Sequence, residues 1–172
     1  FARMPEPEKQ KTDLTQLLSD VVLLQQGTLS NIEITYNKIG SVPLGIIDRT
    51  MMNQVFTNLI KNAGEAILSL EQNKEHTTGK GTIIGYIVIT ISFVENCFII
   101  SIKDTGVGLP ENSVSLFEPY VTTRTEGTGL GLSIVKKIIE QHNGTISLDR
   151  LSPSDDSPNF STEVVVLLPH SV

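Results

Sequence analysis

Three polar side chains, Asn58, Asn62 and Glu65, follow one another at helical spacing in a largely apolar stretch. At about 100° per residue they fall within roughly 60° of each other, so they form a polar stripe beside an apolar helix face. Two carboxamides one turn apart can offer oxygen atoms to a single hard cation, and Mg²⁺ prefers oxygen ligands. The pattern is a candidate magnesium site, although a solvated helix face would show the same residues.

A second group, Asp104-Thr-Gly106-Val-Gly108, directly follows an apolar stretch that is typical of a strand. A carboxylate at the end of a strand can accept a hydrogen bond from an amino group of a ligand. The two glycines allow the backbone to approach that ligand or to adopt positive φ. A glycine-rich turn closed by a capping aspartate would have the same sequence.

A third group, Gly127-Thr128-Gly129-Leu130-Gly131, opens a helix expected over about residues 130–141. The free N–H groups at the start of a helix form an anion site that the helix dipole strengthens. No Lys-Ser/Thr pair follows, so the group is not a Walker A loop, and it also lacks the spacing of the dinucleotide fingerprint. It indicates either a phosphate-binding loop or a flexible helix entry.

The composition is that of an ordinary globular domain: 172 residues, net charge −6, 39% hydrophobic and 19% charged residues. The acidic balance argues against a nucleic-acid binder. Five of the 13 glycines lie between Asp104 and Gly131, where four acidic residues accompany a single base, Arg124. Together the three groups supply a metal site, an acceptor for a base edge and a phosphate cradle, in an order that suits a nucleoside triphosphate.

Apolar periodicity predicts the elements that position these groups. We expect an α/β fold of the two-layer α+β type, with a mixed sheet of about five strands and three main helices on one face. Residues 1–12 are expected to be a linker from a preceding domain, and residues 13–172 a single domain. Helices are expected over 13–27, with Asp13 as N-cap, 49–70 and 130–141, and strands over 31–38, 44–47, 82–94, 98–103, 145–149 and 163–168.

The chain contains neither a disulfide pair nor an apolar run long enough to span a membrane. The lone cysteine, Cys97, is flanked by apolar residues and is expected to be a packed thiol in a strand. The three histidines are scattered, without metal-ligand spacing among them or with Cys97. These features favour a reducing, cytoplasmic compartment.

The motifs resemble the catalytic ATP-binding domain of sensor histidine kinases, in the superfamily that includes DNA gyrase, the Hsp90 chaperone and MutL, and that domain has the Bergerat-type fold. The resemblance covers about residues 13–169. The opening Phe-Ala-Arg-Met-Pro and the run 120–124 are similar to the nitrogen-regulation, NtrY-type branch. The matching motifs are an N box at 58–66, a G1 box at 104–108, an F box at 117–120 with Tyr120 where Phe is usual, a G2 box at 127–132 and a terminal strand at 162–169.

The resemblance implies a role for each matching position. Asn62 would bind Mg²⁺ with assistance from Asn58, and Asp104 would accept from the adenine amino group. Residues 109–126 would form a loop over the nucleotide, in which we expect Arg124 to meet the γ-phosphate unless it is a solvent-exposed loop residue. The implied nucleotide contacts are Asn58, Asn62, Glu65, Ala66, Asp104, Gly106, Gly108, Leu109, Thr122, Thr123, Arg124, Gly127, Thr128, Gly129, Leu130, Gly131 and Thr162.

Asn58 occupies the position at which the ATP-hydrolysing members of the superfamily carry Glu. A carboxamide cannot act as a general base, which favours phosphoryl transfer over hydrolysis. None of the three histidines, His76, His142 and His170, fits a phosphoacceptor, so the acceptor is expected in a dimerisation domain outside this chain. The alternatives are an ATP-hydrolysing switch domain and a nucleotide-binding module without catalytic activity.

The resemblance also implies partners and a location. We expect a cognate response regulator, a homodimeric parent protein in the bacterial inner membrane, and a cytoplasmic position for this domain. No nucleic-acid partner is expected.

Overall fold

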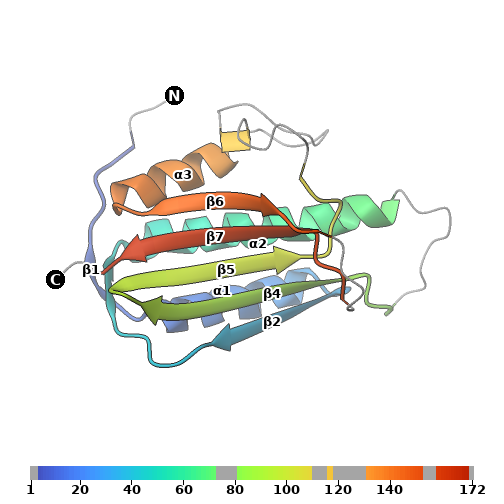
Figure 1. Cartoon of the computed structure of the whole chain (residues 1–172), viewed down its shortest axis with the longest axis horizontal. Helices are drawn as coiled ribbons and strands as arrows, with labels where there is room; N and C mark the ends of the chain where they lie inside the picture. Colours follow the sequence, from blue (N-terminus) through green and yellow to red (C-terminus); the bar gives the residue numbers. More distant parts are fainter. Residues whose placement is uncertain (1–3, 73–80, 110–115, 118–130, 153–157, 171–172) are drawn as a thin grey trace.

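The computed structural model arranges the chain in two layers, a β-sheet and a layer of helices on one of its faces (Figure 1). It describes residues 4–72, 81–109, 116–117, 131–152 and 158–170. In chain order the elements are β1 Gln10–Thr12, α1 Leu14–Thr28, β2 Ile32–Lys38, β3 Gly45–Ile47, α2 Arg49–Gln72, β4 Gly85–Val94, β5 Cys97–Asp104, α3 Gly131–Gln141, β6 Thr145–Arg150 and β7 Thr162–Pro169.

The main sheet has five strands in the order β2-β4-β5-β7-β6. β2 runs parallel to β4 and the other neighbours are antiparallel, so the sheet is mixed, as predicted. The hairpin between β4 and β5 turns at Glu95 and Asn96, whose φ angles are 51° and 62°. Two successive residues at positive φ fit a type I′ turn, which matches the twist of the flanking strands.

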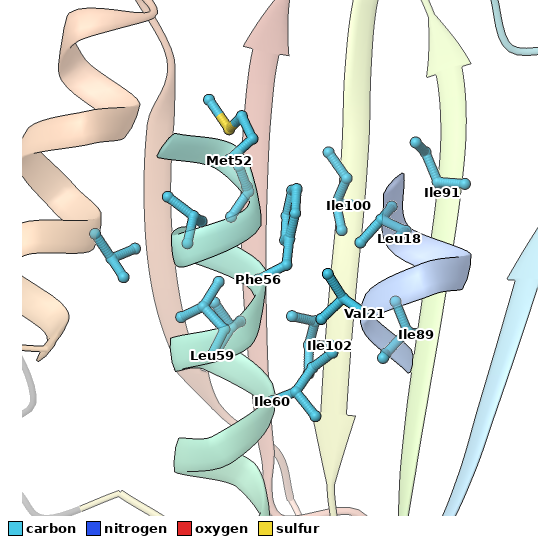
Figure 2. Close-up of a cluster of buried hydrophobic side chains, with 14 of the residues drawn as sticks. Leu18, Val21, Met52, Phe56, Leu59, Ile60, Ile89, Ile91, Ile100 and Ile102 are labelled. Carbon is cyan, nitrogen blue, oxygen red and sulfur yellow. The ribbon is translucent and has the colours of Figure 1, made fainter. Parts of the chain in front are cut away.

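The core lies between the sheet and the helices. Alternate residues of β5 are buried, which leaves one face of this strand against the helices and the other face more open. Phe56 of α2 points toward the sheet, and Leu18 and Val21 of α1 face the same layer (Figure 2). The two-layer architecture predicted from periodicity is therefore confirmed.

The first strand was not predicted from the sequence. Gln10–Thr12 lies in the segment expected to be a linker, yet it pairs antiparallel with β3, from Gln10 opposite Ile47 to Thr12 opposite Gly45. A segment of three residues is too short to show the alternation of apolar and polar residues that indicates a strand, and its partner strand is distant along the chain.

Helix and strand boundaries otherwise agree with expectation to within a few residues. Asp13 caps α1, because its carboxylate accepts a hydrogen bond from the backbone N–H of Gln16 at 3.1 Å. β4 begins at Gly85, three residues after the predicted start. No helix in the described part of the chain is long and apolar enough to cross a bilayer.

Candidate nucleotide-binding site

Asp104 ends β5 with its side chain buried at the edge of the helix layer; it is 4% exposed. It stands directly opposite Thr162, the first residue of β7, which is 6% exposed. Side chains directly opposite each other on antiparallel strands share a face and lie about 5 Å apart at Cβ. A buried carboxylate and a buried hydroxyl are thus brought together from positions far apart in the sequence.

The turn after Asp104 is packed against the second half of α2. The carboxylate Oδ1 accepts from the N–H of Gly106 at 2.9 Å, and the N–H of Val107 donates to the carbonyl of Ala66 at 3.1 Å. A Cβ on Gly106 would lie 2.6 Å from both the carbonyl carbon and the Cβ of Ala66. Only glycine fits this contact, and Gly108 further on has a φ of 87°.

The candidate magnesium ligands lie on α2 beside this turn. Asn58 and Asn62 are half-buried, whereas Glu65 is exposed. Ala66, the last residue of the same motif, carries the contact to Gly106. The contact of Ala66 with Gly106 and Val107 therefore joins the end of the first motif to the second group, at the end of the sheet where β5 finishes and β7 begins (Figure 1).

The third group is described only at its last residue. Gly131 is the first residue of α3, and a Cβ built on it meets nothing within 4 Å. This start of α3 points toward the same end of the molecule as the end of β5 (Figure 1). Seven of the other predicted contacts lie outside the described residues: Thr122, Thr123, Arg124, Gly127, Thr128, Gly129 and Leu130. Among them is Arg124, the proposed γ-phosphate ligand.

Phe117 of the F box is described, and it lies against α3. The ammonium of Lys136 is 5.6 Å from the centre of the Phe117 ring, within the range of a cation–π contact. Lys136 also approaches Glu140 one turn later at 4.0 Å. Lys136 of α3 therefore contacts the aromatic side chain of this motif.

Two residues that hold the turn at Asp104 were not predicted. The hydroxyl of Ser161 lies 2.7 Å from the carbonyl oxygen of Gly106, and its backbone N–H donates to the carbonyl of Asp104 at 2.9 Å. Arg150 donates to the carbonyl of Leu109 at 2.7 Å. In the sequence Ser161 closes a Ser/Pro/Asp-rich loop, and its position next to Thr162 is the only signal that could have singled it out.

We predict that Ser161→Ala weakens binding of a non-hydrolysable ATP analogue by about 3- to 10-fold, because the Gly106 carbonyl loses its hydroxyl partner, a loss of roughly 1 kcal/mol. Calorimetric titration measures the affinity. Ser152→Ala, the same change at an exposed serine on the other side of the loop, serves as the control and should bind normally. Equal affinities for both variants would show that the hydroxyl does not hold the turn.

The chain matches the family model described as "Histidine kinase-, DNA gyrase B-, and HSP90-like ATPase" over residues 47–172. The chain belongs to this family. It is also 38% identical over 153 residues to the nitrogen regulation protein NtrY of Azorhizobium caulinodans, covering 87% of this chain and 18% of that protein. The sensory histidine kinase/phosphatase NtrB of Rhizobium leguminosarum is 36% identical over 156 residues, or 87% of this chain and 38% of that protein.

Solved structures agree with this placement. The catalytic domain of the histidine kinase ThkA superposes with a TM-score of 0.76 and 28% identity, covering 95% of this chain and 96% of that one. ThkA in complex with the response regulator protein TrrA gives a TM-score of 0.70 at 25% identity, covering 95% of this chain and 42% of that one. The predicted fold and the resemblance to the NtrY-type ATP-binding domain of sensor histidine kinases are confirmed.

Proposed function

We propose that this domain binds ATP with Mg²⁺ and transfers the γ-phosphate to a histidine in a dimerisation domain outside this chain. The observation that carries the proposal is the buried pair of Asp104 and Thr162 beside the glycine turn packed on Ala66. A carboxylate held by the N–H of Gly106 is oriented to accept from an exocyclic amino group, and the missing Cβ at Gly106 keeps the backbone close to α2.

The residues on α2 fit a magnesium ion that is shared with a triphosphate. Among the described residues no group of three or more His, Cys, Asp or Glu could hold a metal ion by itself. Asn62, with Asn58 one turn earlier, offers neutral amide oxygens, which suits a cation that takes its other ligands from phosphates and water. When bound, Mg²⁺ would neutralise charge on the phosphates.

The remaining roles belong to residues of this chain. The N–H groups of Gly129, Leu130 and Gly131, the last of which begins α3, would bind phosphate oxygens, and Arg124 would meet the γ-phosphate. Thr122, Thr123 and Leu109 would complete the loop over the nucleotide. These groups bind and orient the triphosphate, which is most of what phosphoryl transfer requires of a protein.

The likeness to longer proteins supports further proposals about partners. This chain spans 18% of NtrY and 38% of NtrB, so the activity of a whole protein of this kind is a proposal here. We propose residues 1–12 as the connection to a dimerisation domain and 13–172 as the catalytic domain. By analogy with the ThkA–TrrA complex, a response regulator would receive the phosphoryl group. The parent would be a homodimer in the inner membrane, with this domain in the cytoplasm.

Radiolabelled ATP tests the transfer. With Mg²⁺, label should appear in an added NtrY dimerisation domain that carries its histidine, and no label should appear in this chain incubated alone. Asn62→Ala should slow labelling by about tenfold or more, since the metal loses its ligand. Asn53→Ala, on an exposed position of the same helix, should label at the normal rate. Steady phosphate release by the isolated chain, without label in the acceptor, would instead identify a hydrolysing switch.

A further inference from the structure

Asp48 connects the N-terminal segment to the start of α2. One carboxylate oxygen, Oδ1, accepts from the N–H of Met51 at 3.0 Å and caps the helix. The other oxygen, Oδ2, accepts from the N–H of Glu8 at 2.8 Å. Asp48 is only 8% exposed; its hydrogen bond with Met51 is buried and the one with Glu8 is half-buried. One side chain therefore joins the segment Met4–Thr12, which we call the strap, to α2.

His142 joins the same point to the end of α3. Its Nε2 lies 3.0 Å from the backbone N of Asp48, and its Nδ1 lies 2.8 Å from the carbonyl oxygen of Ile138. A carbonyl can only accept and a backbone N–H can only donate. The proton is thus on Nδ1, and Nε2 is the bare acceptor. Only the neutral ring with this tautomer makes both hydrogen bonds, and the ring is 4% exposed.

The strap has further contacts on both sides of this point. The side-chain amide of Gln141, at the end of α3, donates to the carbonyl of Pro5 at 3.3 Å. Further along, Gln10–Thr12 pairs with β3 immediately before Asp48. The strap, the start of α2 and the end of α3 meet at the end of the sheet opposite the candidate site (Figure 1).

Both helices extend from this joint to the candidate site. At about 1.5 Å per residue, Asn58 and Asn62 lie roughly 15–20 Å along α2 from Asp48. Gly131 lies a similar distance along α3 from His142. A change in the angle between the two helices at the joint would change the distance between Asn58 and Asn62 on α2 and the first turn of α3.

We propose that Asp48 and His142 are positioning residues, which set α2 and α3 relative to each other and couple the strap to the nucleotide site. This inference rests on the proposed nucleotide binding. Protonation of His142 would place a hydrogen on Nε2 against the N–H of Asp48, and the joint would open. A movement of the chain that precedes the strap would act on the same hydrogen bonds through Glu8.

The electrostatic surroundings favour the neutral ring. Burial lowers the pKa of His142; the Ile138 carbonyl opposes this shift, Lys9 of the strap adds to it, and Asp48 opposes it. Because the folded-state pKa lies below the ordinary value of 6.5, the unfolded chain binds a proton that the folded chain does not. The contribution of the neutral His142 ring to the free energy of unfolding is complete above about pH 6.5, and it falls as the pH drops toward the folded-state pKa.

Asp48 titrates in a different range. Burial raises the pKa of Asp48, but hydrogen bonds from the backbone of Met51, Glu8 and Thr50, together with His142, outweigh it and leave the pKa below 3.8. Its contribution to stability is present above pH 3.8 and is lost only in stronger acid. Measurements between pH 7.5 and 5.5 therefore report on His142 and not on Asp48.

The test compares His142→Ala with His142→Gln, because the Gln oxygen can reach the N–H of Asp48 without titrating. At pH 7.5 the Ala variant should lose hydrogen-exchange protection at Glu8 by about 10- to 100-fold. Its affinity for a non-hydrolysable ATP analogue should fall by about 3- to 10-fold, and Gln should restore both properties. When the pH is lowered from 7.5 to 5.5, the wild type should lose more affinity than the Gln variant. The Gln variant has no titrating ring at position 142, so its loss of affinity measures the effect of acid on the nucleotide itself.

His170→Gln is the control, since His170 is a half-buried histidine that directly follows β7, and its Nε2 lies 3.0 Å from the carbonyl oxygen of Leu44 and not at the joint. If His142→Ala does not fold, Glu8→Pro removes the N–H that meets Asp48 while His142 stays in place. Because proline has no amide N–H to exchange at position 8, this variant is tested by affinity alone, and the same loss of affinity is expected. Lost protection with unchanged affinity would overturn the coupling, and unchanged protection would overturn the joint. Failure of the wild type to bind the analogue at either pH would overturn the proposed function, while the exchange data would still report on the joint.

Discussion

Replacing Asp104 with asparagine is expected to reduce the affinity for a non-hydrolysable ATP analogue by roughly 30- to 150-fold, equivalent to about 2–3 kcal/mol. The Asn oxygen can still accept from the N–H of Gly106, so the turn is retained. The amide nitrogen then faces the adenine amino group, which sets two donors against each other in a buried site. Calorimetry measures the affinity, and thermal unfolding checks that the fold is intact.

The nature of the contact can be tested with inosine triphosphate, which carries a carbonyl where ATP has the amino group. The wild type should strongly prefer ATP, and Asp104→Asn should lose or invert this preference because its amide can donate to the carbonyl. Asp149→Asn makes the same change at an exposed position of β6 and should leave both affinities unchanged. An unaltered preference in Asp104→Asn would show that this side chain does not read the base.

Much of the fold could be predicted because it depends on local patterns. In α2 apolar residues recur at intervals of three and four residues along a helix of 24 residues, so the predicted bounds agree with the structure to within two residues. β1 could not be found, since three residues show no period and its pairing with β3 is set by distant packing. Sheet order is likewise decided by long-range contacts that the sequence pattern does not contain.

The candidate site shows the same division. Asp104 and Gly106 were predicted because their types and spacing suit a ligand, whereas Ser161 contributes only through its position in the fold. His142 directly follows the helix expected over residues 130–141, and the sequence alone gives it no partner. Its contact with the N–H of Asp48, 94 positions earlier, exists only once α2 and α3 are packed together. Residues that position a site are harder to predict than residues that would touch the ligand.

Gly106→Ala is expected to have the second large effect, on stability as well as on binding. The new Cβ would lie 2.6 Å from the carbonyl carbon of Ala66, a distance that Cβ atoms essentially never show. Since α2 is held by its core side chains, the turn must move and break the hydrogen bond from Val107 to Ala66. We expect a loss of about 1–3 kcal/mol in the free energy of unfolding and roughly 3–10 °C in Tm.

Gly27→Ala provides the matched control, because a Cβ on Gly27 in α1 meets nothing within 4 Å. That variant should be as stable as the wild type or more stable by up to about 1 kcal/mol, since alanine favours the helix. The double variant Gly106→Ala/Ala66→Gly removes one of the two clashing atoms at 2.6 Å and leaves the carbonyl carbon. It should therefore recover only part of the stability and of the ATP-analogue affinity. A Gly106→Ala variant that unfolds and binds like the wild type would mean that the turn does not need its contact with α2.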